Sequence, residues 1–306
     1  MITVAVTGAT GFIGSVLLKL LVDQGFQVRS LYRPASTSSP DRTDSVHWQA
    51  GDLGDMDSLR ALVAGADAVV HCAGTVRGVT LEHFKEANAA GVARLAEVAV
   101  ELKVHRFLLM SSLAAREPSL SDYALSKKMG EDVLLGYQGK ICCDILRPPA
   151  VYGPGDREMR PLLQLVRRGL VPVIGAKNGR FSLLYVDDLA EAVNCLLKTE
   201  PAQEGRCFEL HDGHPDGYTW LQIAEIASHL NGKKPLNLAV PRSLLQLIAL
   251  GNHCLARLLG YPPMLTPGKV REIFHPDWVC DNTAISKAVD WQPRILFSEG
   301  MKRLFP

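Results

Sequence analysis

The sequence lacks an excess of charge of either sign. Its 306 residues include 33 Lys and Arg against 32 Asp and Glu, a formal net charge of +1. Proteins that bind nucleic acid through its phosphates normally carry a clear excess of positive charge. The balance therefore gives no reason to expect nucleic acid as a partner.

Cysteine is scarce and is not arranged in pairs. The seven cysteines are an odd number, no two have the spacing of zinc ligands, and Cys142 and Cys143 are adjacent. We therefore expect reduced thiols in a cytoplasmic protein. His211 and His214 lie close together without a third ligand, which predicts residues of a surface turn and no metal site.

The sequence also lacks a segment typical of targeting or of a membrane span. No basic stretch precedes the first apolar residues, which argues against a signal peptide. The least polar run, residues 243–256, is shorter than the ~20 residues that a spanning helix needs. We interpret this run as a core helix or an apolar wall of a substrate pocket, with contact to a membrane surface as the alternative.

The first 150 residues, in contrast, alternate short β-branched runs with helical patterns. This alternation predicts an α/β fold, a Rossmann-type doubly wound parallel sheet with crossover helices. The predicted strands are residues 2–7, 27–32, 46–50, 68–73, 106–111 and 142–147, and the predicted helices are residues 14–24, 56–64, 81–102 and 121–137.

The pattern changes after Arg147 to loops rich in proline and glycine, followed by mixed short strands and helices. We therefore predict an NAD(P)-binding Rossmann domain over residues 1–149 and a smaller mixed C-terminal substrate-binding domain over residues 150–306. Residues 181–197 are expected to rejoin the first domain. Residues 34–44, which are polar and rich in Pro, Ser and Thr, are predicted to form an exposed loop.

Three glycines at a spacing of three, Gly8, Gly11 and Gly14, stand between the first strand and the first helix. Such a turn lets the backbone approach a pyrophosphate, whose charge is stabilised by the N–H groups at the start of the helix. The turn therefore predicts a dinucleotide site. The residues between the glycines that we assign to it are Thr10, Phe12 and Ile13.

The end of the second strand indicates which dinucleotide is bound. NAD-binding proteins place an acidic residue there to bind the ribose hydroxyls, whereas this strand ends in Arg33. A guanidinium at this position favours the 2′-phosphate of NADP, with NAD as the alternative if Arg33 is a solvated loop cation. Arg29 and Arg42 could also contribute to binding the 2′-phosphate.

Two further strand ends face the same edge of the predicted sheet. Asp52 and Leu53 follow the third predicted strand. Asp52 could accept a hydrogen bond from the amino group of adenine, or it could be the acidic residue that stabilises the N-terminus of the next helix. Ala73 and Gly74 are small and would let the backbone pass close to the cofactor. Both pairs are therefore assigned to cofactor binding.

The residues predicted to carry the chemistry are Ser112, Tyr123 and Lys127. The spacing of four residues puts Tyr123 and Lys127 on one face of a helix. A nearby ammonium and the nicotinamide cation would lower the pKa of the phenol, so that Tyr123 can exchange a proton with a substrate oxygen. Lys127 would also hold the nicotinamide ribose, and Ser112 would polarise the substrate oxygen.

Together these motifs resemble a known family, the extended and atypical short-chain dehydrogenase/reductases. This group includes the NAD-dependent epimerase/dehydratases and the relatives of 3β-hydroxysteroid dehydrogenase and flavonoid reductase. The motifs appear in the family's order over residues 1–197: TGATGFIG, GDL, HCAG, the serines 111 and 112, YALSKKMGE, LRPPAVYGPGD and YVDDLA.

The resemblance implies roles for further residues. Pro148 would lie near the nicotinamide, Asn88 would support the active site, and Glu131 would be structural. Family members often dimerise through the helices predicted at residues 81–102 and 123–137, so the resemblance also implies a homodimer. Nucleotide-sugar enzymes of the family usually have Asn where this chain has Ala150, a departure that weakens a nucleotide-sugar substrate.

Three functions follow from this reading. The leading hypothesis is an NADP(H)-dependent oxidoreductase that interconverts a secondary alcohol and a ketone on a fairly apolar small molecule. The second is a nucleotide-sugar epimerase or dehydratase. The third is a non-catalytic NADP-binding accessory protein, similar to the dinucleotide-binding subunit of respiratory complex I, although the intact Ser112, Tyr123 and Lys127 argue against it.

Overall fold

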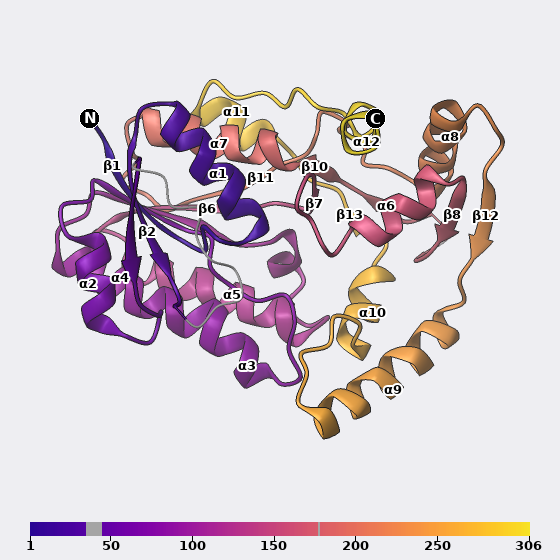
Figure 1. Ribbon diagram of the computed structural model, residues 1–306, viewed down its shortest axis with the longest axis horizontal. Helices are drawn as coiled ribbons and strands as arrows, with labels where there is room; N and C mark the ends of the chain where they lie inside the picture. Colours follow the sequence, from indigo (N-terminus) through magenta and orange to yellow (C-terminus); the bar gives the residue numbers. More distant parts are fainter. Residues whose placement is uncertain (35–44, 177) are drawn as a thin grey trace.

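A computed structural model describes residues 1–34, 45–176 and 178–306. Most of the loop predicted at residues 34–44, including Arg42, lies outside the described residues. The chain forms a layered sheet at one end and a group of smaller elements at the other (Figure 1).

The larger part is built on a parallel sheet of seven strands in the order β11-β6-β5-β4-β1-β2-β3. This order confirms the predicted Rossmann-type fold, because the chain moves outward from β1 in both directions. The strands are β1 (Thr3–Thr7), β2 (Gln27–Tyr32), β3 (Val46–Ala50), β4 (Ala68–His71), β5 (Arg106–Met110), β6 (Cys142–Arg147) and β11 (Arg206–Glu209).

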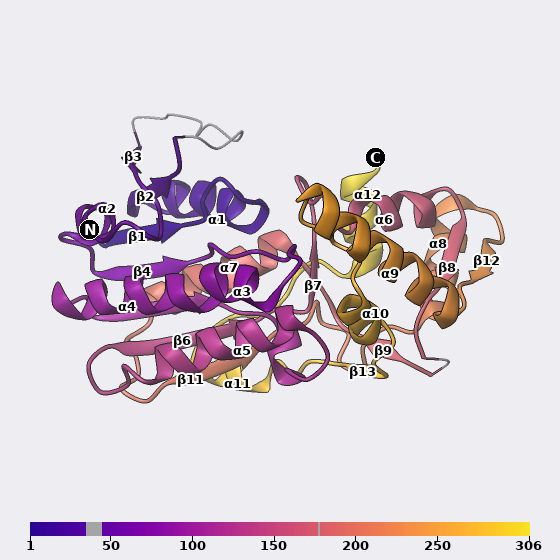
Figure 2. The same ribbon diagram turned by 90° about the horizontal axis from the view of Figure 1, so that it is seen from below.

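Helices cover both faces of this sheet (Figure 2). Successive residues of a strand point to opposite faces, so Val4 and Val6 of β1 join one apolar core and Ala5 joins the other. The first core is covered by α1 (Phe12–Asp23), α7 (Val186–Lys198) and α11 (Thr283–Ala288). The second is covered by α2 (Met56–Val63), α4 (Gly91–Glu101) and α5 (Asp122–Leu135).

The helix predicted at residues 81–102 is interrupted. It consists of α3 (Leu81–Lys85), a π-helical turn η1 (Glu86–Ala90) and α4. A β-carbon on Gly130 of α5 would lie 2.1 Å from the carbonyl oxygen of Asn88 in this turn. Helix α5 therefore packs directly against the π turn, a type of turn that often occurs at functional sites.

Residues 181–197 contribute a helix but no strand to the large sheet. Leu189, Val193 and Leu196 of α7 are fully buried in the core that also contains Leu17 of α1. The short strand β10 (Leu183–Tyr185) pairs instead with β7 (Ala150–Tyr152). The seventh strand of the sheet is β11, which pairs with β6. We had predicted this segment to lie in the C-terminal substrate-binding domain.

The remaining elements lie at the other end of the molecule, where a third apolar core contains Tyr152, Tyr185, Tyr218 and Phe297. They are α6 (Arg160–Arg167), β8 (Leu170–Val173), β9 (Arg180–Phe181), α8 (Trp220–Asn231), β12 (Leu236–Ala239), α9 (Arg242–Leu259), α10 (Pro267–Ile273), β13 (Asp277–Trp278) and α12 (Phe297–Leu304).

The apolar run at residues 243–256 was predicted to be a core helix or an apolar wall of a substrate pocket, with contact to a membrane surface as the alternative, and the core helix is wrong. The run forms most of α9, whose buried residues are Ala249 and Ala256. Most of its leucines are exposed, and the helix extends along the outside of the molecule (Figure 1). No helix in the described part of the chain is long and apolar enough to cross a bilayer.

A buried ion cluster attaches β11 to the sheet. Asp144 of β6 accepts from Arg106 Nε of β5 at 2.8 Å and from Arg206 Nε of β11 at 2.7 Å. Arg106 also donates to the carbonyl oxygens of Leu196 and Thr199 at the end of α7. Asp144 is 2% exposed, so its charge is balanced by these two guanidinium groups and not by water.

We expect Asp144→Asn to lower the free energy of unfolding by about 3–5 kcal/mol, because it leaves Arg106 buried without a counter-charge. Urea unfolding measures this loss. The matched control is Asp57→Asn, whose carboxylate is 94% exposed and pairs with Arg60 at the surface. That substitution should cost less than about 1 kcal/mol, and equal losses for the two variants would contradict the assignment.

Candidate active site

The glycine turn packs tightly against the end of β4. Gly8 has a φ of +75°, and a β-carbon on it would lie 2.5 Å from the backbone nitrogen of Ala73. A β-carbon on Gly14 would lie 2.1 Å from the carbonyl oxygen of Gly8. The start of α1 at Phe12 has no side-chain cap among the described residues. This backbone cradle fits a pyrophosphate, whose charge the uncapped N–H groups can bind.

Of the two described arginines considered for the 2′-phosphate, Arg33 is the one whose side chain faces solvent. Arg33 is exposed and directly follows β2. Arg29 instead donates to the carbonyl oxygens of Ala61 and Ala64 at the end of α2, at 2.6 and 2.8 Å. Arg29 is therefore committed to the fold.

Asp52 is exposed beside the end of β3, and its carboxylate accepts from the backbone nitrogen of Gly54 at 2.9 Å. The residue that caps α2 is Asp55. The carbonyl oxygen of Leu53 accepts from Arg94 Nε at 2.7 Å, so Arg94 holds this segment against α4. The N-cap position of α2 is thus already filled, and Asp52 stabilises the turn that precedes it.

Gly74 lies against the side chains of Asn88 and Lys127. A β-carbon on it would lie 2.7 Å from Asn88 Oδ1 and 3.4 Å from Lys127 Nζ. Asn88 in turn bonds both backbone polar groups of Thr75, at 2.9 and 3.0 Å, and donates to Ser126 Oγ at 3.0 Å. The π turn therefore uses Asn88 to connect the strand end after β4 with α5.

The predicted catalytic residues come from two adjacent elements. Ser112 is the N-cap of a short 3-10 helix, η2 (Leu113–Arg116), and Tyr123 lies in the first turn of α5. Lys127, one turn further along, donates to the carbonyl oxygen of Met110 at the end of β5, at 2.8 Å. Ser112 lies close enough to Tyr123 for its hydroxyl to lower the pKa of the phenol.

The electrostatics of this group differ from the prediction. Burial raises the pKa of Tyr123 above its ordinary value, and the Ser112 hydroxyl and the charge of Lys269 only partly oppose this effect. Lys269 lies beside the phenol ring and is a cation that the prediction did not include. Burial also lowers the pKa of Lys127, to about 8.

Helix α5 is held in place by a buried ion pair. Glu131 is 1% exposed and accepts from Arg147 Nε at 2.8 Å and from Arg147 Nη2 at 2.5 Å. It also accepts from Ser111 Oγ at 2.6 Å. The carbonyl oxygen of Pro148, next to Arg147, accepts from the backbone nitrogen of Leu113 at 2.8 Å. The ends of β5 and β6 are therefore tied both to α5 and to the segment that carries Ser112.

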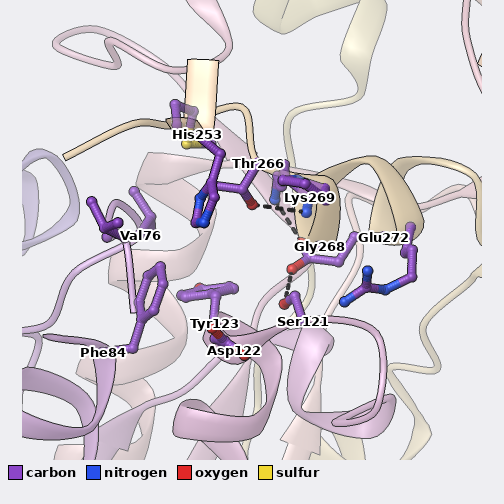
Figure 3. A pocket seen from close by; sticks show the side chains of 15 residues that line it. Val76, Phe84, Ser121, Asp122, Tyr123, His253, Thr266, Gly268, Lys269 and Glu272 are labelled. Atoms are coloured by element: carbon purple, nitrogen blue, oxygen red, sulfur yellow. Dashed lines mark hydrogen bonds and ion pairs between the residues drawn. The ribbon is translucent and has the colours of Figure 1, made fainter. Parts of the chain in front are cut away.

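A cavity opens beside Tyr123 between α5 and the C-terminal helices (Figure 3). Its walls include the apolar residues Val76, Val79, Phe84 and Met264 and the polar residues Ser121, Tyr123, His253, Thr266 and Lys269. The rings of Phe84 and Tyr123 meet edge to face at 6.1 Å. The cavity thus combines an apolar wall with a titratable hydroxyl.

The sequence reading missed the residues of α10 in this cavity. Lys269 Nζ lies 5.7 Å from the centroid of the Tyr123 ring and 2.7 Å from Glu272 Oε2. The Ser121 hydroxyl, at the N-cap of α5, donates to Glu272. Thr266 followed by proline signals the start of a helix, but no local pattern indicates that this helix meets α5.

His211 and His214 were predicted to lie on a surface turn, and for His211 this is wrong. His211 is 7% exposed, and its Nδ1 accepts from the backbone nitrogen of Gly213 at 3.0 Å. The His214 ring packs on Tyr218. Within the described ranges, no group of three side chains is placed to hold a metal ion.

The parallel sheet and the glycine turn define a Rossmann-type enzyme that uses a nicotinamide dinucleotide. Residues 4–210 match the model of the NAD dependent epimerase/dehydratase family, and the chain belongs to this family. Its relatives are reductases, dehydrogenases and epimerases, so the protein is an NAD(P)-dependent oxidoreductase or epimerase/dehydratase.

Three similar proteins illustrate this range. A ceramide reductase of Caulobacter vibrioides is 37% identical over 94% of this chain and 88% of its own. The mitochondrial NADH dehydrogenase (ubiquinone) 1 alpha subcomplex subunit 9 of Arabidopsis thaliana is 29% identical over 85% of this chain and 66% of its own. The structure of UDP-glucuronic acid 4-epimerase from Bacillus cereus, with UDP-glucuronic acid and NAD, has a TM-score of 0.76 at 19% identity over 99% of this chain and 98% of its own.

Glu131→Gln removes the charge that Arg147 faces while it keeps the size of the side chain. We expect a loss of about 3 kcal/mol in the free energy of unfolding, because Arg147 then lacks a buried counter-charge. Thermal unfolding measures it. The control on the same helix is Asp132→Asn, which removes an exposed pair with Lys128 and should cost about 0.5 kcal/mol or less. A Glu131→Gln variant as stable as this control would show that the pair is not an anchor.

Proposed function

We propose that the protein is an NADPH-dependent reductase that converts a ketone on a long-chain lipid of the ceramide type into a secondary alcohol. The observation that carries the proposal is the position of Tyr123 beside this cavity, where its ring meets Phe84 edge to face at 6.1 Å and the lining also includes Val76, Val79 and Met264. The similarity to the Caulobacter ceramide reductase, over most of both chains, supports this substrate class.

In this proposal each polar group has a separate task. The nicotinamide, when bound, supplies the hydride. Tyr123 donates the proton to the carbonyl oxygen, and its raised pKa keeps the phenol protonated for this role. Ser112 orients the phenol and the substrate oxygen through its hydroxyl. Lys127, next to Gly74, binds the ribose hydroxyls of the cofactor.

The size of the cavity limits what it can hold. Its volume is about 190 Å³, below the roughly 300 Å³ at which pockets for drug-sized ligands begin. A long-chain lipid would therefore place only its keto end beside Tyr123. The alkyl chains would leave the cavity past α9, which contributes His253 to the wall. In this arrangement the elements around the third apolar core form the substrate-binding part.

The choice of NADPH rests on Arg33, which is exposed at the end of β2 where an NAD-binding protein carries an acid. We expect the protein to bind NADPH at least about tenfold more tightly than NADH, or about 1.4 kcal/mol, in a fluorescence titration. Arg33→Ala should remove this preference by weakening NADPH alone, and Arg33→Lys should keep part of it. Equal affinities in the wild type would reject Arg33 as the selector.

Replacement of the proposed proton donor gives the sharpest test of the reaction. Tyr123→Phe should lower kcat for NADPH-dependent reduction of a long-chain keto-ceramide by about 10²–10⁴-fold, because no other group takes over the proton transfer. NADPH affinity should stay within about twofold. Tyr137→Phe, just beyond the end of α5, is the control and should leave kcat unchanged.

Two other outcomes separate the rival functions. Turnover of a UDP-sugar without net oxidation of NADPH would favour an epimerase, a reading that Ala150 weakens. An unchanged rate in Tyr123→Phe with intact cofactor binding would favour a non-catalytic accessory protein, and the similarity to the NADH dehydrogenase subunit keeps that reading relevant.

A further inference from the structure

One surface carries most of the exposed large apolar side chains in the described part of the chain. Of fifteen such residues, nine lie between residues 236 and 259, on β12 and α9. We call this the β12–α9 surface. Monomeric proteins seldom expose a contiguous apolar patch of this kind unless something covers it.

The orientation of α9 is the reverse of that of an ordinary surface helix. Ala249 and Ala256 are fully buried, and Asn252, between them, donates to the carbonyl oxygen of Leu265 at 2.9 Å. On the opposite side Leu247 is 69% exposed and Leu258 is 82% exposed. A surface helix normally turns its leucines toward the core, so this apolar side is built to meet something other than water.

The charges around this surface indicate the nature of the partner. Residues 232–260, which contain β12 and α9, include four Lys and Arg and no Asp or Glu, whereas the whole chain has a net charge of only +1. Lys233 and Lys234 are exposed just before β12, and Arg242 and Arg257 are exposed on α9. A second copy of this chain would bring the same positive charges face to face. An anionic surface would neutralise them.

We propose that the β12–α9 surface docks on a membrane that contains anionic lipids, with the leucines of α9 inserted at the boundary between headgroups and acyl chains. The helix then lies in the plane of the membrane and does not span it. The inner side of α9 contributes His253 to the cavity beside Tyr123. In the docked state α9 therefore lies between the bilayer and the candidate active site. The docking rests on exposure and charge, and it does not depend on the proposed reaction.

The test is co-sedimentation of the full chain with vesicles of equal parts phosphatidylcholine and phosphatidylserine. We expect the wild type to sediment with them, and much less with vesicles of phosphatidylcholine alone. Leu247→Ser combined with Leu258→Ser should weaken binding by roughly tenfold or more, because two inserted leucines are lost. Lys233→Gln combined with Lys234→Gln should weaken it by roughly fivefold for each lysine.

The matched control is Leu221→Ser on α8, since Leu221 is 68% exposed and lies outside the β12–α9 surface. Leu221→Ser should bind vesicles as the wild type does. Tyr123→Phe should also bind them normally, because membrane docking does not require the proposed reaction. A wild type that stays in the supernatant would overturn the proposal. So would a double leucine variant that still sediments. Concentration-dependent dimers that Leu247→Ser abolishes, without vesicle binding, would assign the surface to a second copy.

Discussion

The buried pair between Glu131 and Arg147 is the interaction on which the site depends. It joins α5, which carries Tyr123 and Lys127, to the end of β6, and Ser111 extends the link to β5. A buried carboxylate needs such partners, because an unpaired charge in the interior is strongly unfavourable. In the proposed reaction the glycine turn would hold the cofactor on the neighbouring strand ends. One ion pair and one backbone turn would then set the relative position of the hydride and the proton donor.

Much of the fold could be predicted from the sequence. Strands β2, β3 and β6 have the predicted bounds, because each is a short β-branched or apolar run between clear breaks. Strand β11 escaped detection because its sequence, Arg-Cys-Phe-Glu, has no local signature, and its place depends on Arg206 reaching Asp144 across the sheet. The π turn was missed for a similar reason, since the close contact between Gly130 and Asn88 is tertiary.

Spacing along the sequence predicted that Tyr123 and Lys127 share one face of α5. It gave no sign of Lys269, which comes from a distant part of the chain and lies 5.7 Å from the centroid of the Tyr123 ring. The sequence of residues 243–256 also allowed a core helix, which the exposure of its leucines excludes. Composition alone does not distinguish a helix that faces a core from one that faces outward, and α9 faces outward. An apolar cavity wall beside an outward-facing apolar helix suits a substrate with long alkyl chains.

The most direct test of the proposed reduction is to follow the hydride from NADPH to the lipid. The purified protein would be incubated with a long-chain keto-ceramide and NADPH deuterated at the transferable position, and the lipid product would be analysed by mass spectrometry. We expect an alcohol that carries a single deuterium on the former carbonyl carbon, formed together with an equal amount of NADP⁺. Cofactor that binds tightly but transfers no deuterium to the lipid would contradict it.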